Sequence, residues 1–283
     1  MQRKDPFIRV DCDLCGGGNH GVLFDKEGFV HVRCRDCGLV FVNPRPAGHG
    51  ERQKSEGTGT MGDDRPTSAQ IGRMRRELAS MEPFRRYNRM LEIGAGRGWF
   101  LDEASKSGWR TWALEINRDA LHHLESRRID TIITEPAETF HVDPGTMDVV
   151  RIWDVIEHLE SPRKAAERIR HALRPGGLVR LSTTNFASLS RWLNGPEWVY
   201  LNGADHIHLF EPKTITRLLS EIGFTDIRVA TRSFNMRRKL YHPERDLPVK
   251  FPFLRPVRKL IDETIRLTPY GHQMIVTAIK AER

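Results

Sequence analysis

The sequence predicts an α/β protein with a seven-stranded doubly wound sheet and a small N-terminal metal module. An apolar run at Met90–Ile93 is followed by three alternate glycines and by a helix from Trp99 to about Ser107. This order is the strand, turn and helix of a nucleotide-binding fold. All four cysteines lie in the first 37 residues as two Cys-x-x-Cys pairs. At 283 residues, the chain is long enough for one large domain and one small module.

The cysteine pairs predict a zinc ribbon over residues 1–46. Eighteen residues separate the pairs, and the alternating apolar and polar residues of 21–32 favour a hairpin between them. Four thiolates leave no open position on the ion, so we expect a structural zinc. Two disulfides or a redox pair are the alternatives, and a reducing cytoplasm disfavours the disulfides. The expected ligands are Cys12, Cys15, Cys34 and Cys37.

Residues 47–87 are expected to connect the ribbon to the large domain. The stretch 47–64 is rich in Gly, Ser and Thr, which is typical of a linker. A helix is predicted from about Thr67 to Tyr87, because apolar residues recur there at helical spacing. We expect this helix to pack on the edge of the first strand.

The glycine turn predicts where a ligand binds. Gly94, Gly96 and Gly98 let the backbone turn sharply and approach a ligand without a Cβ in the way. The next predicted strand, 111–115, ends on Glu115, about 20 residues after the turn, where a carboxylate can accept both hydroxyls of a ribose. Glu115 is therefore the predicted ribose ligand.

Two motifs resemble those of a known family. Glu92 followed by Gly-x-Gly-x-Gly resembles motif I of the class I S-adenosylmethionine (SAM) dependent methyltransferases, and Asp154 to Leu159 resembles the Glu-His-Leu motif of the ubiquinone-biosynthesis O-methyltransferase group. The resemblance implies a Rossmann-like methyltransferase domain over 88–283 with strand order 3-2-1-4-5-7-6, SAM as cofactor, and a lid as a second role for helix 67–87. The cofactor residues that it implies are Glu92, Gly94, Ala95, Gly96, Gly98, Glu115, Ala137, Glu138 and Asp154.

The remaining elements follow from apolar periodicity and from stop signals such as Arg174-Pro175-Gly176-Gly177. Helices are predicted at 119–127, 163–173 and 212–221, and strands at 131–133, 147–153, 178–183, 224–230 and 273–279. In this family the last strand is antiparallel and lies between strands five and six.

Asp154, Glu157 and His158 place two carboxylates and an imidazole near one turn of chain. Three roles are open for this group. It can bind a second divalent ion that orients a hydroxyl substrate, as some members of the family do. His158 can be a general base, because a neutral imidazole titrates near neutral pH. The group can also simply hold the loop to the strand.

The irregular apolar stretch 185–210 is expected to form part of the acceptor pocket, as it does in proteins similar to this one. His206 is the first candidate for a base or a substrate-orienting residue, and His208 is the second. A structural role for each histidine is equally expected.

The net charge of +8 is concentrated in one segment. The stretch from Arg232 to Lys259 contains nine basic and two acidic residues, which gives it a net charge of +7. This segment belongs to an insertion over 232–270 between the last two strands, with one helix predicted at 257–267. The rest of the chain is nearly neutral, which argues against a nucleic-acid surface over the whole molecule. No stretch approaches about 18 apolar residues, and we expect a cytoplasmic protein without a transmembrane segment.

The sequence thus predicts methyl transfer from SAM to a small metabolite, first of all to a hydroxyl oxygen. One alternative is an RNA methyltransferase that uses the ribbon and the basic segment to bind RNA, which makes nucleic acid the alternative partner. A non-catalytic binding module is a second alternative, which the intact glycines and Glu115 disfavour. The sequence does not predict the oligomeric state.

Overall fold

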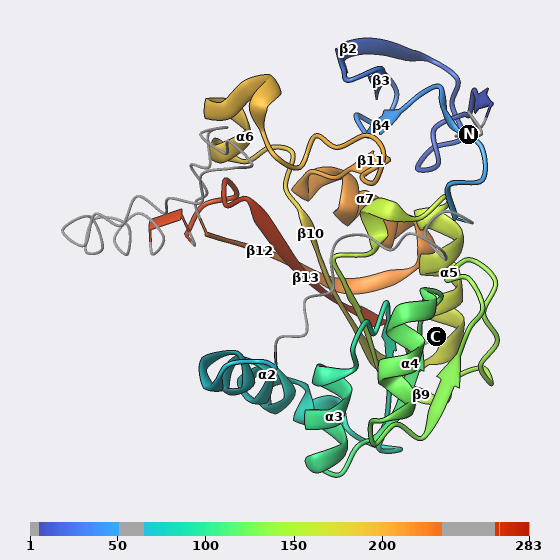
Figure 1. Cartoon of the computed structure of the whole chain (residues 1–283), viewed down its shortest axis with the longest axis vertical. Helices are drawn as coiled ribbons and strands as arrows, with labels where there is room; N and C mark the ends of the chain where they lie inside the picture. The colour runs from blue at the N-terminus through green and yellow to red at the C-terminus, as the bar shows by residue number, and fades with distance from the viewer. Residues whose placement is uncertain (1–5, 51–64, 234–263, 266, 283) are drawn as a thin grey trace.

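A computed structural model describes residues 6–50, 65–233, 264–265 and 267–282. Two main sheets organise this part of the chain, a seven-stranded sheet with helices on both faces and a four-stranded sheet near the N-terminus (Figure 1). None of the described helices is long and apolar enough to cross a membrane.

The seven-stranded sheet confirms the predicted fold class and strand order. The central strands are parallel, and the last strand of the chain is antiparallel to both of its neighbours. From one edge to the other the strands are β12 (Phe224–Arg232), β13 (Gln273–Lys280), β10 (Leu173–Thr184), β9 (Met147–Trp153), β6 (Arg89–Ile93), β7 (Arg110–Leu114) and β8 (Thr131–Ile133).

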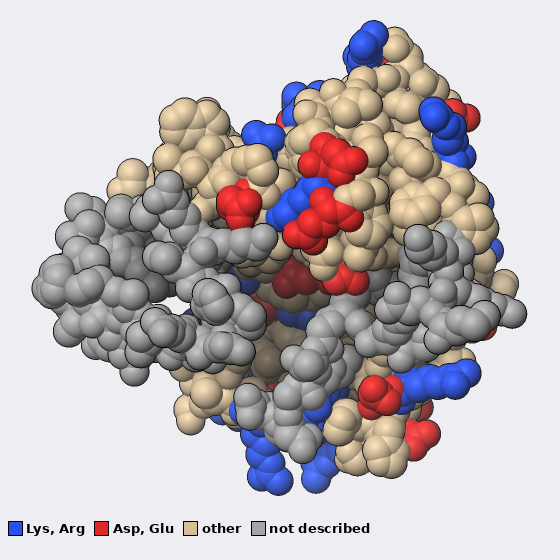
Figure 2. All heavy atoms as spheres, turned by 45° about the horizontal axis from the view of Figure 1, so that its top comes forward, with Lys and Arg blue, Asp and Glu red and all other residues tan. Residues whose placement is uncertain are grey.

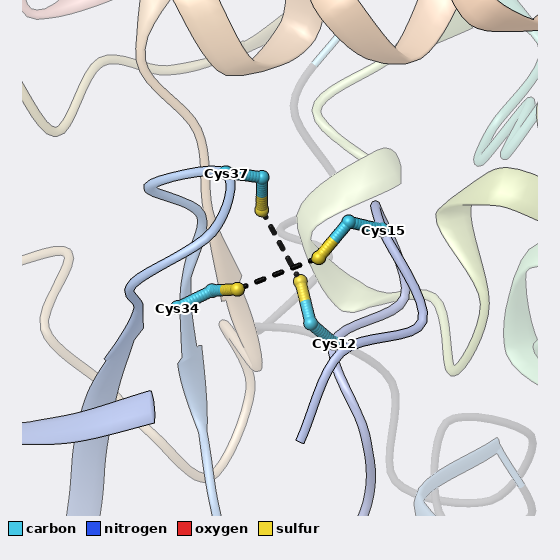
Figure 3. Close-up of side chains that lie close together, drawn as sticks. All are labelled: Cys12, Cys15, Cys34 and Cys37. Atoms are coloured by element: carbon cyan, nitrogen blue, oxygen red, sulfur yellow. Dashed lines mark hydrogen bonds between the residues drawn. The ribbon is translucent and has the colours of Figure 1, made fainter. Parts of the chain in front are cut away.

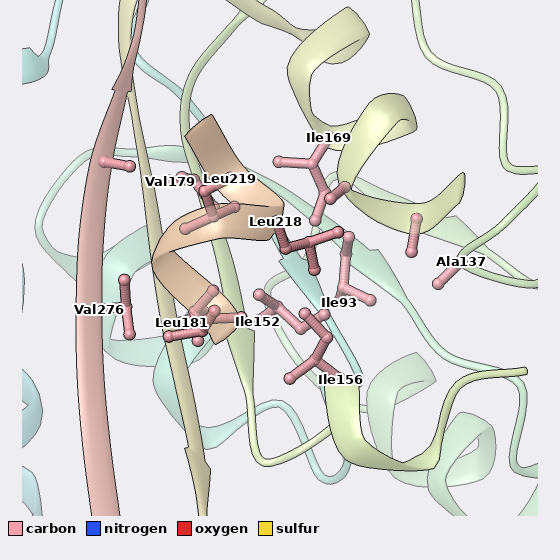
Figure 4. Packing of buried hydrophobic residues seen from close by; sticks show 14 of the residues in the cluster. Ile93, Ala137, Ile152, Ile156, Ile169, Val179, Leu181, Leu218, Leu219 and Val276 are labelled. Carbon is pink, nitrogen blue, oxygen red and sulfur yellow. The ribbon is translucent and has the colours of Figure 1, made fainter. Parts of the chain in front are cut away.

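Helices cover both faces of this sheet because side chains of successive strand residues point to opposite faces. In β9, Val149 packs with one helix layer and Val150 with the other. Figure 4 shows the second layer, where Leu218 and Ile169 point toward Ile152 of the sheet. The first layer consists of α2 (Ser68–Met81), α3 (Trp99–Lys106) and α4 (Arg118–Glu125), and the second of α5 (Pro162–Ala172) and α7 (Pro212–Ile222).

Two predicted elements differ in length from the observed ones. The helix predicted to reach Tyr87 ends at Met81 and continues as a 3-10 turn over Glu82–Phe84, because Pro83 lacks the N–H that an α-helix needs. Strand β10 begins at Leu173 rather than Leu178, with an irregular register between these two residues. Most of the predicted helix 257–267 and most of the basic insertion lie outside the described residues, and Thr264 and Ile265 of that helix are helical.

The predicted ribbon hairpin is present, and a strand from the far part of the chain joins it. Strands β2 (His20–Lys26), β3 (Phe29–Cys34) and β4 (Val40–Val42) form an antiparallel sheet whose fourth strand is β11 (His208–Leu209). A separate short pair joins β1 (Phe7–Ile8) to β5 (Arg45–Pro46). The short helix α6 (Leu189–Asn194) and two 3-10 turns, η2 (Ile156–His158) and η3 (Gly195–Glu197), complete the described elements.

The glycine turn after β6 has left-handed backbone angles at each of its three glycines. At Gly94, with φ of +69°, an added Cβ would lie 2.2 Å from Cγ2 of Val155. At Gly98, it would lie 2.7 Å from Cδ2 of Leu124. At Gly96, with φ of +54°, no atom lies within 4 Å of that position. Two glycines are therefore required for packing as well as for conformation, and the middle one borders open space.

We predict that Gly94→Ala lowers the free energy of unfolding by about 1–3 kcal/mol more than Gly96→Ala does. Both substitutions place an alanine in the left-handed region, at a cost of about 1–2 kcal/mol each. Only Gly94→Ala also forces the stiff, β-branched Val155 to move. Thermal or urea unfolding of the two variants measures the difference, and equal losses would contradict this account of the turn.

Candidate functional site

A pocket of about 660 Å³ lies at the carboxyl ends of the central strands, where ligands bind in doubly wound folds. Its walls come from the glycine turn, from the ends of β7 and β9, from the loop after β8, from the start of α5 and from the segment that leaves the ribbon. Among the residues predicted to bind the cofactor or act in catalysis, those that line it are Gly94, Gly96, Glu115, Ala137, Glu138, Asp154 and His158.

Glu115 is held rigidly in the pocket wall. One carboxylate oxygen accepts a hydrogen bond from the N–H of Gly96 at 2.8 Å. The other accepts from the N–H groups of Ile116 and Asn117, each at 2.8 Å. An ionised carboxylate has about four lone-pair sites, so both oxygens keep acceptor capacity for the two hydroxyls of a ribose. The arrangement matches the predicted ribose ligand.

Ala137, Glu138 and Asp154 also take their predicted places along the pocket. The carboxylate of Glu138 accepts from the N–H of Ser161 at 3.3 Å, which ties the loop after β8 to the start of α5. Asp154 follows β9 with φ of +52°, and its carboxylate accepts from Oγ of Ser182 at 2.6 Å and from Nε2 of Gln273 at 3.1 Å. Asp154 therefore contacts β10 and β13 as well as the pocket.

Glu92, Ala95 and Gly98, which are also predicted to bind the cofactor, are not among the residues that line the pocket. Glu92 points into the layer of α2 and α3, where its carboxylate pairs with the buried guanidinium of Arg151. Burial raises the pKa of Glu92 to about 7 against the opposing effect of Arg151. Ala95 packs in the core of the same layer, and Gly98 is the N-cap of α3. These residues support the glycine turn on the side of α2 and α3.

His158 and His206 form a pair beside the pocket, with ring centroids 4.7 Å apart at 74°. Nδ1 of His158 lies 3.0 Å from the carbonyl oxygen of Asp205, and Nδ1 of His206 lies 3.1 Å from that of Tyr200. A carbonyl oxygen only accepts hydrogen bonds, so Nδ1 carries the proton in both rings. Each Nε2 therefore presents a lone pair.

Glu157 completes a three-residue cluster with these histidines. One ligand atom from each of Glu157, His158 and His206 lies within 4.8 Å of the others. The predicted ion site of Asp154, Glu157 and His158 is thus corrected at one position, because Asp154 is bound to Ser182 and Gln273 and His206 stands in the cluster instead. His206 comes from a distant stretch of chain, so the local spacing of the motif did not predict it.

Burial sets the protonation of this cluster. Burial lowers the pKa of His158, and burial together with the charge of His158 lowers the pKa of His206 to about 3. Burial and the neighbouring Asp154 raise the pKa of Glu157 to about 8. At neutral pH both imidazoles are therefore neutral. Neutral imidazoles accept hydrogen bonds and bind metal ions well, and the low pKa of His206 makes that imidazole a weak proton acceptor.

His208, the second catalytic candidate, lies outside the pocket, which corrects that prediction. It is 1% exposed on β11, with its ring stacked between Phe41 and Phe210 at 6.5 and 6.3 Å. Burial lowers its pKa to about 3. Its role is to pack the strand that joins the ribbon sheet.

Several pocket residues were not predicted. Trp153 ends β9 and lines the pocket, with the guanidinium groups of Arg151 and Arg232 at 4.1 and 5.4 Å from its ring. Its place at the carboxyl end of a buried strand was a signal that sequence reasoning could have used. Gly48 and Gly50 also line the pocket, and no local pattern could have shown this, because it depends on how the ribbon packs.

The four cysteines form a second candidate site, which can hold a metal ion. Figure 3 shows their sulfur atoms converging from two turns of chain. Cys12 and Cys37 have sulfur atoms 3.4 Å apart, as do Cys15 and Cys34, and all four ligand atoms lie within 4.8 Å of one another. A tetrahedral zinc with bonds of about 2.3 Å requires sulfur separations of about 3.8 Å, so the residues fit this ion. None of the four is in a disulfide.

Comparisons with known proteins agree with this geometry. A family model described as a methyltransferase domain matches residues 67–229, more than half of the chain. A ubiquinone biosynthesis O-methyltransferase of Idiomarina loihiensis is 24% identical over 176 residues, 58% of this chain and 72% of that protein. The enzyme of the same name from Thiobacillus denitrificans is 23% identical over 175 residues, 58% of this chain and 75% of that protein.

Solved structures show the same fold. A SAM-dependent methyltransferase from Archaeoglobus fulgidus superposes with a TM-score of 0.53 at 20% identity, over 74% of this chain and 92% of that one. Phosphoethanolamine N-methyltransferase 2 of Haemonchus contortus, in complex with SAM, gives a TM-score of 0.56 at 18% identity, over 86% of this chain and 63% of that one. With the family match over more than half its length, the chain belongs to the methyltransferase domain family and is a class I SAM-dependent methyltransferase.

Proposed function

We propose that this enzyme methylates a small-molecule acceptor, with a hydroxyl oxygen as the methylated atom, and that the four cysteines hold a structural zinc. The observation that carries the proposal is a single pocket lined both by the glycine turn with Glu115 and by His158, whose ring pairs with His206. The names of the O-methyltransferase relatives support oxygen as the acceptor atom.

One group of pocket residues binds the cofactor in this proposal, and another holds the acceptor. When bound, SAM supplies an electrophilic methyl group on a sulfonium. Glu115 accepts the ribose hydroxyls, the turn at Gly96 gives the cofactor room to approach the backbone, and Ala137 and Glu138 border the adenine. In this reaction the acceptor oxygen bonds to the methyl carbon as the carbon–sulfur bond of the sulfonium breaks, SAM leaves as the neutral thioether S-adenosylhomocysteine, and the hydroxyl proton passes to an imidazole Nε2 or to water. Methyl transfer needs mainly proximity and in-line alignment, so the remaining task of the protein is to hold the acceptor oxygen in place.

The Nε2 atoms of His158 and His206 are suited to hold an acceptor hydroxyl, because each presents a lone pair to an O–H donor. With Glu157, the two histidines also form a donor set that fits a divalent ion, which would orient the hydroxyl oxygen directly. Methyl transfer by enzyme treated with a chelator, and then resupplied with Mg²⁺ or Zn²⁺, decides between direct hydrogen bonding and an ion.

The alternative substrate, RNA, gains no support. The relatives and structures described above do not have names that refer to RNA. On the face shown in Figure 2, the described Lys and Arg side chains are scattered and interspersed with Asp and Glu rather than gathered in one basic patch. A phosphate-binding surface would require the basic residues to be concentrated.

We predict that label from methyl-labelled SAM enters the small-molecule fraction of an extract of the producing organism. Metal-replete enzyme is incubated with the extract, and the small-molecule and RNA fractions are then separated and counted. The labelled compound is identified by mass spectrometry, which distinguishes O-methylation from N- or C-methylation. Label in RNA, absent from a reaction with heat-inactivated enzyme, would refute the proposed substrate class.

We predict that Glu115→Gln raises the dissociation constant of SAM about tenfold or more, because hydrogen bonds to a charged acceptor are each worth about 1.5–3 kcal/mol. The variant keeps the shape of the side chain. Glu125→Gln, on the exposed face of α4, is the matched control and should bind SAM as the unaltered enzyme does. Titration calorimetry gives both constants. Unchanged affinity in Glu115→Gln would remove Glu115 from the cofactor site.

We predict that His158→Ala and His206→Ala each lower methyl transfer about a hundredfold, because a misplaced acceptor loses its alignment with the methyl group. SAM affinity should stay within about twofold, since neither imidazole is assigned to the cofactor. His141→Ala, at a histidine side chain with 76% exposure, serves as the control. Loss of SAM binding in parallel with turnover would instead indicate a structural role for the pair.

A further inference from the structure

We infer that the zinc ribbon holds in place the elements that form the walls of the methyltransferase pocket, and that zinc binding and SAM binding therefore strengthen each other. This inference rests on the SAM and zinc binding proposed above. It is carried by three separate contacts through which the ribbon holds the elements that surround the pocket.

The first contact is made by the first cysteine knuckle. Asp13 lies between Cys12 and Cys15, and its carboxylate accepts from Oγ of Ser161 at 2.6 Å and from the N–H of Arg163 at 2.8 Å. Asp13 thus occupies the N-terminus of α5, where a negative charge is favoured by the helix dipole. Ser161 lines the pocket, so the knuckle fixes one of its walls.

The second contact is the shared sheet. Strand β11 pairs with β4, and the N–H of Val42 donates to the carbonyl oxygen of Ile207 at 2.9 Å. Arg33 of β3 forms an ion pair with Glu211 at 2.8 Å. Gly203 packs so closely on Phe29 that an added Cβ would lie 2.4 Å from it.

Residues 200–209, which end in β11 of this sheet, position the pair of His158 and His206. This stretch includes His206, and the carbonyl oxygens of Tyr200 and Asp205 hold Nδ1 of His206 and of His158 respectively. The register of the ribbon sheet therefore determines where both imidazoles lie. Asp13 and Arg33 are positioning residues in this sense, since neither lines the pocket itself.

The third contact lies where the chain leaves the ribbon. Arg45 of β5 donates to the carbonyl oxygen of Glu160 at 3.0 Å, and the N–H of Gly50 donates to the carboxylate of Glu160 at 2.8 Å. Gly48, Gly50 and Glu160 all line the pocket. The chain that leaves the ribbon thus forms part of the wall, and Arg45 of the ribbon holds it there.

A common hydrophobic core connects these contacts. Leu14, Leu39 and Phe41 of the ribbon belong to the same buried cluster as Ile152 and Phe210 of the large domain. A module of this size has too little core of its own to stay folded without its metal. Loss of zinc should therefore release the three contacts together, and by linkage SAM must oppose the loss of zinc by the same factor.

The test measures this linkage in the full-length protein. Zinc is titrated against a chromogenic chelator with and without saturating SAM, and SAM binding is measured by calorimetry before and after zinc removal. We expect SAM to shift the chelator midpoint by about fivefold or more, and zinc removal to weaken SAM binding by the same factor. Superimposed chelator curves, in a protein that binds both ligands, would overturn the inference and leave the proposed function intact.

Two pairs of variants keep the test decisive if the zinc-free protein unfolds. Asp13→Asn and Arg33→Met keep all four cysteines but weaken the first and second contacts, so they should retain zinc and bind SAM about fivefold or more weakly. Asp25→Asn and Arg35→Met change exposed residues of the same ribbon and should leave SAM binding unchanged. Unchanged SAM affinity in both Asp13→Asn and Arg33→Met also overturns the inference. If the zinc-loaded, unaltered protein does not bind SAM, it is the proposed function that fails.

Discussion

The hydrogen bond from the N–H of Gly96 to Glu115 is the interaction on which the cofactor side of the pocket depends. It joins the turn after β6 to the end of β7, so the two strands that border the ligand are fixed at the edge where the ligand binds. The bond needs a turn that approaches β7 closely, and the left-handed glycines with Val155 packed against Gly94 make that approach possible. The same carboxylate that closes the turn is thereby fixed in orientation, so binding of the proposed ribose would leave no rotamer of Glu115 to be ordered.

The two halves of the site have different electrostatics for a physical reason. Behind the glycine turn, Arg151 forms ion pairs with Glu92 and Glu77, so an opposite charge within the protein faces both carboxylates. On the acceptor side, burial is the main cause that favours the neutral forms of His158, His206 and Glu157, and the neighbouring Asp154 adds to it at Glu157. A neutral, preoriented acceptor site suits methyl transfer, in which alignment contributes more than proton transfer.

The sequence predicted the features that depend on local pattern. The strand order, the Cys-x-x-Cys cluster and the place of Glu115 follow from apolar runs, spacing and the glycine turn, and the structure agrees with each. It did not predict that His206 rather than Asp154 joins Glu157 and His158, because that cluster is assembled by chain segments about 50 residues apart. His208 failed as a candidate because two aromatic rings enclose it, and packing of this kind is decided by tertiary contacts.

The ribbon sheet helps to hold residues 185–211, the stretch that we expect to form part of the acceptor pocket. Residues 185–211 contain only one short helix, a 3-10 turn and a two-residue strand, so much of this stretch lies outside regular secondary structure. Ordering each residue of such a segment costs about 1–2 kcal/mol of backbone entropy. Structural zinc in small modules contributes on the order of 10–16 kcal/mol to folding, far more than a hydrophobic core of similar size. If the four cysteines hold zinc as proposed, the pairing of β4 with β11 would let that coordination energy help to order the stretch that contains His206. The proposed zinc site is far from His206 along the sequence, and the shared sheet connects the two in the fold.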